Sequence, residues 1–329
     1  MPKLEIIIIT EGGKKNGFGH ITRCLSIASE FKKHNFTVLF IVNGDESIID
    51  VLKNENYKIV NWMEEEIRGN NILLIDSIEI TNKKLLEFEK FNNFIIYIDD
   101  DKRRNILNKG IVIDWTVLSD KQNYFQPKKE NVIYLLGSKY TPLRTEFSIA
   151  ERNTIRKEVK KVMITFGGAD VRNLTPSILK ILSNKFPKVE KHIVIGAGFT
   201  NIDTIKSLKD ENTYLVYSAS TQQMIKLMQN SDIAIASGGQ TLYELARIGT
   251  PTIAILLVEN AKDDTLGWDE VGGVKNIGWY NDKLLFEKLI NTLENLQDYV
   301  LRKKMNYRAK KYIPSDGVKF LVDSILEQL

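Results

Sequence analysis

The stretch from Leu4 to Lys33 reads LEIIIITEGGKKNGFGHITRCLSIASEFKK and indicates the fold more clearly than any other part of the chain. Its first segment, Leu4–Thr10, is an isoleucine run typical of a buried strand. Its last segment, Ile21–Lys33, has apolar residues at helical spacing and predicts an amphipathic helix. Gly17 and Gly19 allow the backbone between them to turn tightly and to approach a ligand closely. Strand, glycine turn and helix in this order predict the start of an open parallel α/β sheet.

His20 lies in this turn, at the carboxyl end of the first expected strand, where ligands bind in such sheets. The helix that follows offers unpaired N–H groups, which suit an anion or a developing negative charge. Of the three histidines, His34 and His192 lie in polar surroundings typical of the surface. His20 is therefore the candidate for proton transfer near neutral pH. A glycine turn with an incidental histidine is the alternative.

Composition restricts the class of protein. The chain has 329 residues, 43% hydrophobic and 27% charged, which is ordinary for a globular protein with room for two domains. Its 46 basic and 42 acidic residues are mixed along the sequence, which argues against a nucleic-acid partner. The single cysteine, Cys24, excludes a disulfide framework and is expected in the core. No signal peptide or membrane span is recognisable, so a cytoplasmic protein is expected, and the sequence does not indicate its oligomeric state.

Strand and helix patterns alternate through the first half of the chain. The expected strands are Leu4–Thr10, Thr37–Val42, Asn71–Ile75, Phe94–Asp99, Ile111–Asp114 and Val132–Leu135. Helices are expected at Ile21–Lys33, Ser47–Asn54 and Asn82–Phe91. Apolar strands flanked by helices predict a parallel sheet covered on both faces.

The alternation restarts after a charged stretch, Thr141–Lys161, which is a candidate hinge. The second set of strands is Lys161–Thr165, His192–Ile195, Tyr214–Tyr217, Ile233–Ala236 and Thr252–Leu257. The helices expected here are Thr175–Lys185, Thr221–Asn230, Leu242–Ile248, Lys283–Asn295, Lys303–Lys311 and Val318–Leu326. The sequence thus predicts two doubly wound Rossmann-like domains, 1–150 and 151–329, with parallel sheets facing an interdomain cleft. For the last helix, packing back on the N-terminal domain is left open as an alternative.

Two further glycine turns lie in the second half. Gly167 and Gly168 follow a strand, with Thr175 as the expected N-cap of the next helix and Pro176 at its first position. Ser237-Gly238-Gly239-Gln240-Thr241 repeats the arrangement and leads into a helix that contains Glu244. This carboxylate is expected either to accept hydrogen bonds from a ribose diol or to stabilise the dipole of its own helix. Neither turn has the Lys-Ser/Thr of a Walker loop, and together they suit a nucleoside diphosphate.

Seven ordered motifs carry a resemblance to a known family. They are Gly17-Phe18-Gly19-His20-Ile21-Thr22-Arg23-Cys24-Leu25, Leu74-Ile75-Asp76, Ile98-Asp99-Asp100, Tyr140-Thr141-Pro142-Leu143-Arg144-Thr145-Glu146-Phe147, Gly167-Gly168-Ala169-Asp170-Val171-Arg172-Asn173-Leu174-Thr175, Ser237-Gly238-Gly239-Gln240-Thr241-Leu242-Tyr243-Glu244 and Val258-Glu259-Asn260. With them the chain resembles the MurG-like branch of the GT-B nucleotide-sugar fold. Within that branch it is most similar to the UDP-sugar hydrolases of pseudaminic acid biosynthesis and to related spore-coat polysaccharide proteins.

The resemblance implies inverting cleavage of the anomeric C–O bond of a UDP-linked diacetamido-trideoxy sugar, in nonulosonic acid or surface glycan biosynthesis. His20 matches the general base that deprotonates the attacking water. The implied substrate and UDP contacts are Gly17, Gly19, Arg23, Asp76, Asp99, Arg144, Gly167, Gly168, Asn173, Ser237, Gly238, Gly239, Thr241, Glu244 and Asn260. No cofactor and no metal are implied, because oriented N–H groups stabilise the leaving group.

The chain departs from the family pattern at Ser77, where a histidine is usual, and at Ala261, where a glutamine is usual. Both positions lie where the sugar should be recognised. Two alternatives to a hydrolase stay open: an inverting GT-B glycosyltransferase in which His20 or Asp99 activates an acceptor hydroxyl, and a non-catalytic sugar-nucleotide-binding protein. Asp99-Asp100-Asp101 suggests capping or substrate hydrogen bonding rather than metal ligation, because three adjacent residues cannot all point at one ion.

Overall fold

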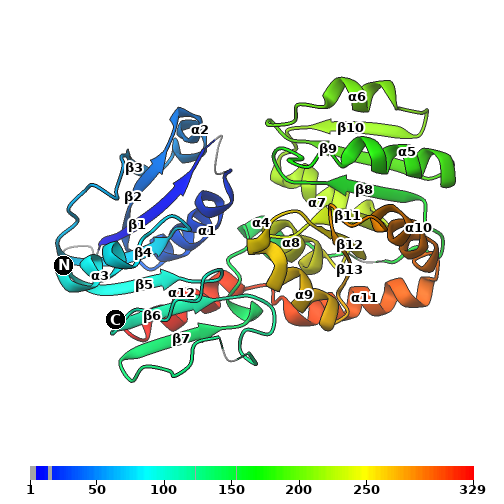
Figure 1. Ribbon diagram of the computed structural model, residues 1–329. Coiled ribbons are helices and arrows are strands. Elements are labelled where there is room, and N and C mark those ends of the chain that lie inside the picture. The colour runs from blue at the N-terminus through cyan, green and yellow to red at the C-terminus, as the bar shows by residue number, and fades with distance from the viewer. Residues whose placement is uncertain (1–4, 14–16, 123, 153) are drawn as a thin grey trace. The chain divides into compact units, whose positions relative to one another are not determined.

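The computed structural model describes residues 5–13, 17–122, 124–152 and 154–329. The chain forms two compact units, each with its own parallel sheet (Figure 1). The first unit comprises the chain up to Arg144 together with Asp316–Leu329, and the second comprises Thr145–Ser315. The short segment Thr145–Ala150 therefore groups with the second unit, and the last helix (red in Figure 1) belongs to the first.

The first unit is built on a seven-stranded sheet whose strand pairs are all parallel. In spatial order its strands are β3 (Asn56–Ile59), β2 (Thr37–Gly44), β1 (Glu5–Gly12), β4 (Gly69–Asp76), β5 (Asn92–Ile98), β6 (Gly110–Asp114) and β7 (Val132–Leu136). Its helices are α1 (Gly19–Lys33), η1 (Glu46–Ile48), α2 (Ile49–Leu52), α3 (Asn82–Phe91), η2 (Ser138–Tyr140) and α12 (Gly317–Leu326). On one face, Ile7 and Ile9 of β1 share a core with Leu85 and Phe88 of α3. Helix α1 contacts both β1 and α12.

The second unit repeats this plan with six parallel strands. Their spatial order is β10 (Thr213–Tyr217), β9 (Glu190–Ile195), β8 (Lys161–Thr165), β11 (Ile233–Ser237), β12 (Thr252–Leu256) and β13 (Val274–Trp279). Its helices are α4 (Thr145–Ser148), α5 (Thr175–Lys185), α6 (Ile202–Ser207), α7 (Thr221–Asn230), α8 (Gln240–Ile248), η3 (Glu259–Ala261), α9 (Lys262–Glu270), α10 (Leu285–Asn295) and α11 (Tyr299–Tyr312). Leucines and isoleucines of α5 and α10 pack with the strands in one hydrophobic core.

Each sheet reverses its strand order beside the first strand of its unit. In the first unit the reversal lies between β1 and β4, and in the second between β8 and β11. Ligands bind outside the carboxyl ends of the strands at such switch points, because the connecting helices there leave on opposite faces. The turns that carry His20, Gly167-Gly168 and Gly238-Gly239 all follow strands at these two points.

The structure confirms two Rossmann-like parallel sheets and corrects several local predictions. Two strands were missed, β3 and β13, and both lie at sheet edges. Helices α4, α6 and α9 were also missed, α4 within the candidate hinge. Thr175 was predicted to cap α5, but the residue at the N-cap is Leu174, and the Thr175 hydroxyl is buried without a hydrogen-bond partner. The Asp170 carboxylate accepts from the backbone N–H groups of Leu174 and Thr175 instead, each at 3.0 Å.

Across the residues that the structure describes, no helix is both long enough and apolar enough to cross a membrane.

Candidate functional site

His20 is the second residue of α1, directly after the turn that leaves β1. The turn is closed by Gly13 and Gly17, whose backbone N–H groups each donate to the other's carbonyl oxygen, at 3.0 and 2.8 Å. Gly17 has φ +73°, a conformation that favours glycine, and a Cβ at Gly19 would meet open space. Phe18 at the N-cap position makes no side-chain cap, so the first N–H groups of α1 have no partner within the helix.

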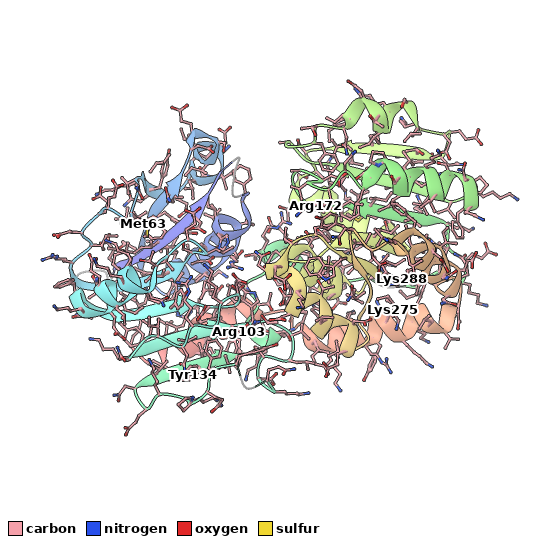
Figure 2. All side chains as sticks on the ribbon, viewed as in Figure 1. Met63, Arg103, Tyr134, Arg172, Lys275 and Lys288 are labelled. Carbon is pink, nitrogen blue, oxygen red and sulfur yellow. The ribbon has the colours of Figure 1, made fainter. Side chains whose placement is uncertain are left out.

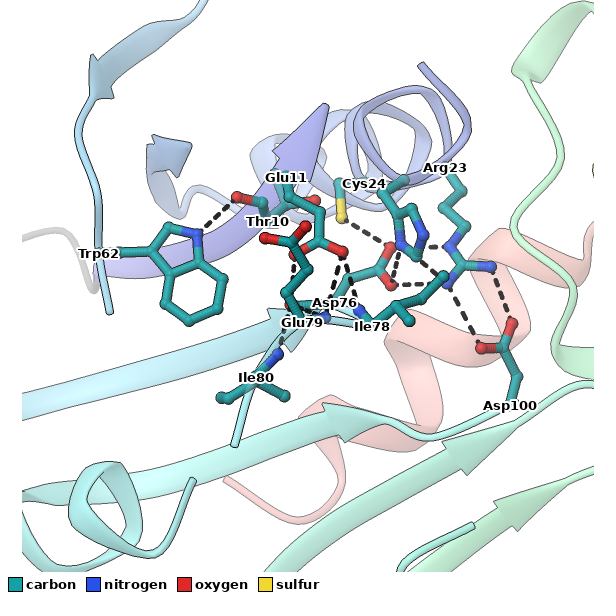
Figure 3. A network of polar contacts seen from close by, with 12 residues as sticks. Thr10, Glu11, Arg23, Cys24, Trp62, Asp76, Ile78, Glu79, Ile80 and Asp100 are labelled. Carbon is teal, nitrogen blue, oxygen red and sulfur yellow. Dashed lines mark hydrogen bonds and ion pairs between the residues drawn. The ribbon is translucent and has the colours of Figure 1, made fainter. Parts of the chain in front are cut away.

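Asp76 fixes the imidazole of His20. Asp76 ends β4, and the strand register places it beside Thr10 of β1, at the switch point. Its Oδ1 lies 2.7 Å from Nδ1 of His20 (Figure 3). Asp76 is fully buried, whereas the side chain of His20 is 14% exposed. Burial by itself raises the pKa of the Asp76 carboxyl, but Arg23 and His20 outweigh burial and hold this pKa well below its usual range. An ionised Asp76 only accepts hydrogen bonds, so its contact with His20 requires a proton on Nδ1.

Arg23, one turn further along α1, lies between two carboxylates. It donates to Asp76 from Nε at 2.7 Å and from Nη2 at 2.6 Å, and to Asp100 from Nη1 at 2.8 Å. Its guanidinium lies 4.7 Å from the ring centroid of buried Trp115. Burial alone lowers the pKa of Arg23, but Asp100 and Asp76 outweigh it and raise this pKa. Neither Asp100 nor Trp115 was among the residues predicted for the site.

A small pocket in the first unit brings His20 together with the chain that follows β4 and β5. Its lining includes Asp76, Ser77, Asp99 and Asp100 beside His20. Asp99 is 3% exposed and accepts the backbone N–H of Arg104, and burial raises its pKa to about 6. Two predicted residues, Asp76 and Asp99, therefore line one pocket with His20, and their pKa values are shifted in opposite directions.

Glu11, which was not predicted, orders the wall next to Asp76. It is 2% exposed; its carboxylate accepts the hydroxyl of Ser77 and the N–H of Ile78, the latter at 2.9 Å (Figure 3). The Ser77 hydroxyl oxygen in turn accepts the N–H groups of Glu79 and Ile80, each at 3.0 Å. Ser77, one of the two positions where the chain departs from the family pattern, is thus a buried residue of a turn. The sequence signal for Glu11 was a charged residue directly after the expected strand Leu4–Thr10.

In the second unit, Gly167 and Gly168 form an exposed turn after β8. Gly167 has φ +68°, and a Cβ on either glycine would meet no atom within 4 Å. Asn173 is exposed, and its Oδ1 accepts from Nδ2 of Asn201 at 2.6 Å. Arg172 (Figure 2) lies over the ring of Tyr280 at 4.2 Å and is a cation near this turn that was not predicted as a contact.

The turn between β11 and α8 combines a packing glycine and an open one. A Cβ on Gly238 would lie 2.6 Å from the Cβ of Ala261 and 2.7 Å from the hydroxyl of Thr265. Close packing against the segment before α9 therefore requires glycine at 238. Gly239 has φ +99° and open space around it, as a ligand-binding turn would need. Ser237 and Thr241 flank it half-buried.

The remaining predicted residues are placed as follows. Glu244 is the fifth residue of α8 and is 5% exposed. Asn260 is exposed in η3, and Arg144 is half-buried at the end of the first unit's main segment. Within the described ranges, no group of three or more His, Cys, Asp or Glu residues could hold a metal ion.

Comparison with known proteins finds similar sequences and structures, whereas no family model matches the chain. The chain is 27% identical over 296 residues to the pseudaminic acid cytidylyltransferase and UDP-2,4-diacetamido-2,4,6-trideoxy-beta-L-altropyranose hydrolase of Helicobacter pylori, covering 90% of the chain and 51% of that protein. It is 21% identical to the spore coat polysaccharide biosynthesis protein SpsG of Bacillus subtilis, over 99% of the chain and 98% of SpsG. The chain also matches the uncharacterised protein MJ1062 of Methanocaldococcus jannaschii, with 27% identity over 77% of the chain and 55% of that protein. It thus spans about half the length of the first two curated relatives it matches, those from H. pylori and M. jannaschii.

Among solved structures, MurG of Acinetobacter baumannii superimposes with a TM-score of 0.71 at 14% identity, covering 99% of the chain and all of that structure. At this identity the likeness shows the fold alone. The chain is a GT-B-fold protein whose relatives include the UDP-sugar hydrolase of pseudaminic acid biosynthesis, SpsG and MurG-like glycosyltransferases.

Proposed function

We propose that this chain is a nucleotide-sugar hydrolase that cleaves the anomeric C–O bond of a UDP-linked diacetamido-trideoxy sugar with inversion. The observation that carries the proposal is the pair formed by His20 and buried Asp76, with 2.7 Å between Nδ1 and Oδ1. A histidine oriented by a carboxylate is suited to accept a proton at its other ring nitrogen. The H. pylori relative, whose name includes this hydrolase activity, supports the choice of reaction.

In the proposed reaction, Nε2 of His20 removes a proton from water as the water oxygen attacks the anomeric carbon. The bond from this carbon to the diphosphate oxygen breaks, and UDP leaves with the electron pair. Asp76 stabilises the imidazolium that forms, because its carboxylate is buried against the ring. General base catalysis of this kind contributes about a hundred- to ten-thousandfold to the rate.

We assign the nucleotide to the second unit. The exposed turn Gly167-Gly168 and the open Gly239 would bring backbone N–H groups close to the diphosphate, since neither leaves a side chain in the way. Glu244 would accept from the ribose hydroxyls, and Ser237, Thr241, Asn173 and Asn260 would contact the rest of the nucleotide sugar. Arg144 would pair with the diphosphate. The proposal invokes no metal.

The test is a panel of UDP-linked sugars, with UDP release measured with and without acceptor sugars or lipids and with and without a chelator. We expect release of UDP and free sugar from a diacetamido-trideoxy donor without acceptor or metal. His20→Ala should lower kcat at least a hundredfold. His34→Ala is the matched control, because His34 is exposed and pairs only loosely with Asp323, at 3.6 Å.

Turnover that begins only when an acceptor is added would establish a glycosyltransferase instead. Tight UDP binding without turnover of any donor would establish a sugar-nucleotide-binding protein. Either outcome contradicts the hydrolase, and full activity of His20→Ala would contradict the role of the imidazole.

A further inference from the structure

Two neighbours of His20 require its proton to be on different ring nitrogens. Nδ1 lies 2.7 Å from Oδ1 of Asp76 and 3.2 Å from Nη2 of Arg23. The carboxylate requires an N–H on Nδ1, whereas the guanidinium, which only donates, requires a lone pair there. A neutral imidazole cannot satisfy both. The tautomer of His20 therefore depends on what else the guanidinium of Arg23 binds.

Asp100, which follows β5, competes for this guanidinium. Its Oδ2 accepts from Nη1 of Arg23 at 2.8 Å, and its Oδ1 lies 3.4 Å from Nη2 (Figure 3). Asp76 binds the adjacent edge of the same group through Nε and Nη2. With Trp115 below its plane, the guanidinium is fixed on both edges and one face. Carboxylates therefore engage Nε, Nη1 and Nη2, and Nη2 is the one of these nitrogens that also lies within hydrogen-bond distance of the imidazole.

We propose that Asp100, acting through Arg23, selects the tautomer of His20 in which Nδ1 carries the proton and Nε2 is the basic nitrogen. Asp100 is then a positioning residue, because it reaches the imidazole only through Arg23. Within the described residues, the side chain of His20 makes its hydrogen-bond contacts with Asp76 and Arg23 alone. The other charged groups that line the pocket make no hydrogen bond to the imidazole; they are Asp99, Asp101, Lys102 and Arg104.

The tautomer can be measured directly without any substrate. The chain has only three histidines, so selective nitrogen-15 labelling of histidine in the full chain gives a simple long-range proton–nitrogen correlation spectrum. His20→Gln assigns the signal of interest, and His34 and His192 serve as internal references. In alkaline buffer we expect a protonated Nδ1 in the unaltered chain.

Asp100→Asn replaces one carboxylate oxygen with an amide NH₂, which cannot accept from Arg23. We expect His20 to shift toward the form with the proton on Nε2, and Asp100→Ala to do the same. Asp100→Glu keeps a carboxylate and should restore the original tautomer. Asp101→Asn removes the same charge from the neighbouring residue and should leave the His20 signals unchanged. Thermal unfolding confirms that each variant is folded.

The proposal is overturned if folded Asp100→Asn and Asp100→Ala both keep the spectrum of the unaltered chain, or if the unaltered chain already has the proton on Nε2. A kinetic measurement rests on the proposed function: Asp100→Asn should lower kcat at least tenfold and change KM less than twofold. If no UDP-sugar is turned over by the unaltered chain, the proposed function fails, whereas the spectra still decide the role of Asp100.

Discussion

Asp76→Asn separates catalysis from folding at the proposed site. The Asp76 carboxylate accepts from Nδ1 of His20, from Nε and Nη2 of Arg23, and at 3.4 Å from the thiol of Cys24. Asparagine has the same shape but only one accepting oxygen. If its NH₂ takes the position of Oδ2, two donors face each other, this NH₂ and Nε–H of Arg23, and the hydrogen bond is lost. With its NH₂ at the Oδ1 position, it faces Nδ1 of His20 and imposes the opposite tautomer.

The magnitude follows from these two orientations. In a serine protease triad, replacing the carboxylate by an amide reverses the histidine tautomer and lowers kcat about ten-thousandfold. Each tenfold loss corresponds to about 1.36 kcal/mol, so the same effect here amounts to about 5 kcal/mol of transition-state stabilisation. Removing one partner of a buried ion pair costs about 3–5 kcal/mol of folding free energy. We expect the lower part of this range, because asparagine keeps one accepting oxygen, and therefore a folded variant.

The assay measures UDP release and urea unfolding on the same preparations. Asp232→Asn is the matched control, since Asp232 is a buried carboxylate of the second unit that accepts from Arg156 at 3.0 Å and from the backbone N–H of Lys160 at 2.8 Å. It should lose stability without a specific loss of kcat. A folded Asp76→Asn variant that retains more than a tenth of the original kcat would refute the orientation of His20 by Asp76.

Two further predictions concern stability. Because burial raises the pKa of Asp99 to about 6 from 3.8, ionised Asp99 opposes folding above that pH by about 3 kcal/mol, and this cost disappears as the pH falls below about 4. Asp99→Asn should therefore raise the free energy of unfolding at pH 8 but not at pH 4, and equal effects at both values would contradict the shift. Gly238→Ala should destabilise the protein by about 1–3 kcal/mol, because its Cβ would lie 2.6 Å from that of Ala261. Gly168→Ala, with open space at its Cβ, should change the melting temperature little, and similar melting temperatures for the two variants would refute the packing role of Gly238.

The strands and glycine turns at both switch points could be predicted from the sequence, because these strands are long apolar runs. Strands β1, β4, β8 and β11 are central, buried on both faces, and therefore read as nearly continuous isoleucine, leucine, valine and alanine. Glycines directly after such runs mark the turns at their carboxyl ends. The two edge strands that were missed, β3 and β13, gave no such signal. β3 reads NYKI, and β13 reads VKNIGW with its register shifted against β12, so neither has a buried run to detect.

The cap of α5 shows why local sequence rules failed at the site itself. Thr175 with Pro176 beside it fits the preferred residues of a helix start, but Asp170, five residues earlier, reaches the same N–H groups through a backbone with φ +42°. Asp170 is also fixed by Nδ2 of Asn201, from the loop before α6. Asn201, 31 residues further along the chain than Asp170, thus helps to hold the carboxylate that caps the helix, and the sequence around Thr175 does not reveal this contact.

The same argument explains why His20 could be recognised in its own segment, whereas its contacts with Asp76 and, through Arg23, with Asp100 could not be worked out from that segment. A scarce histidine in a glycine turn is visible in the sequence, whereas Asp76 and Asp100 lie 56 and 80 residues away along the chain. They come together because β1, β4 and β5 are adjacent and in parallel register, so that the residues at their carboxyl ends share one edge. Arg23 then joins the two carboxylates from the helix that carries His20. The chemical properties of the imidazole therefore depend on the order of the strands, and a change in Asp100 should affect His20 although no hydrogen bond joins the two directly.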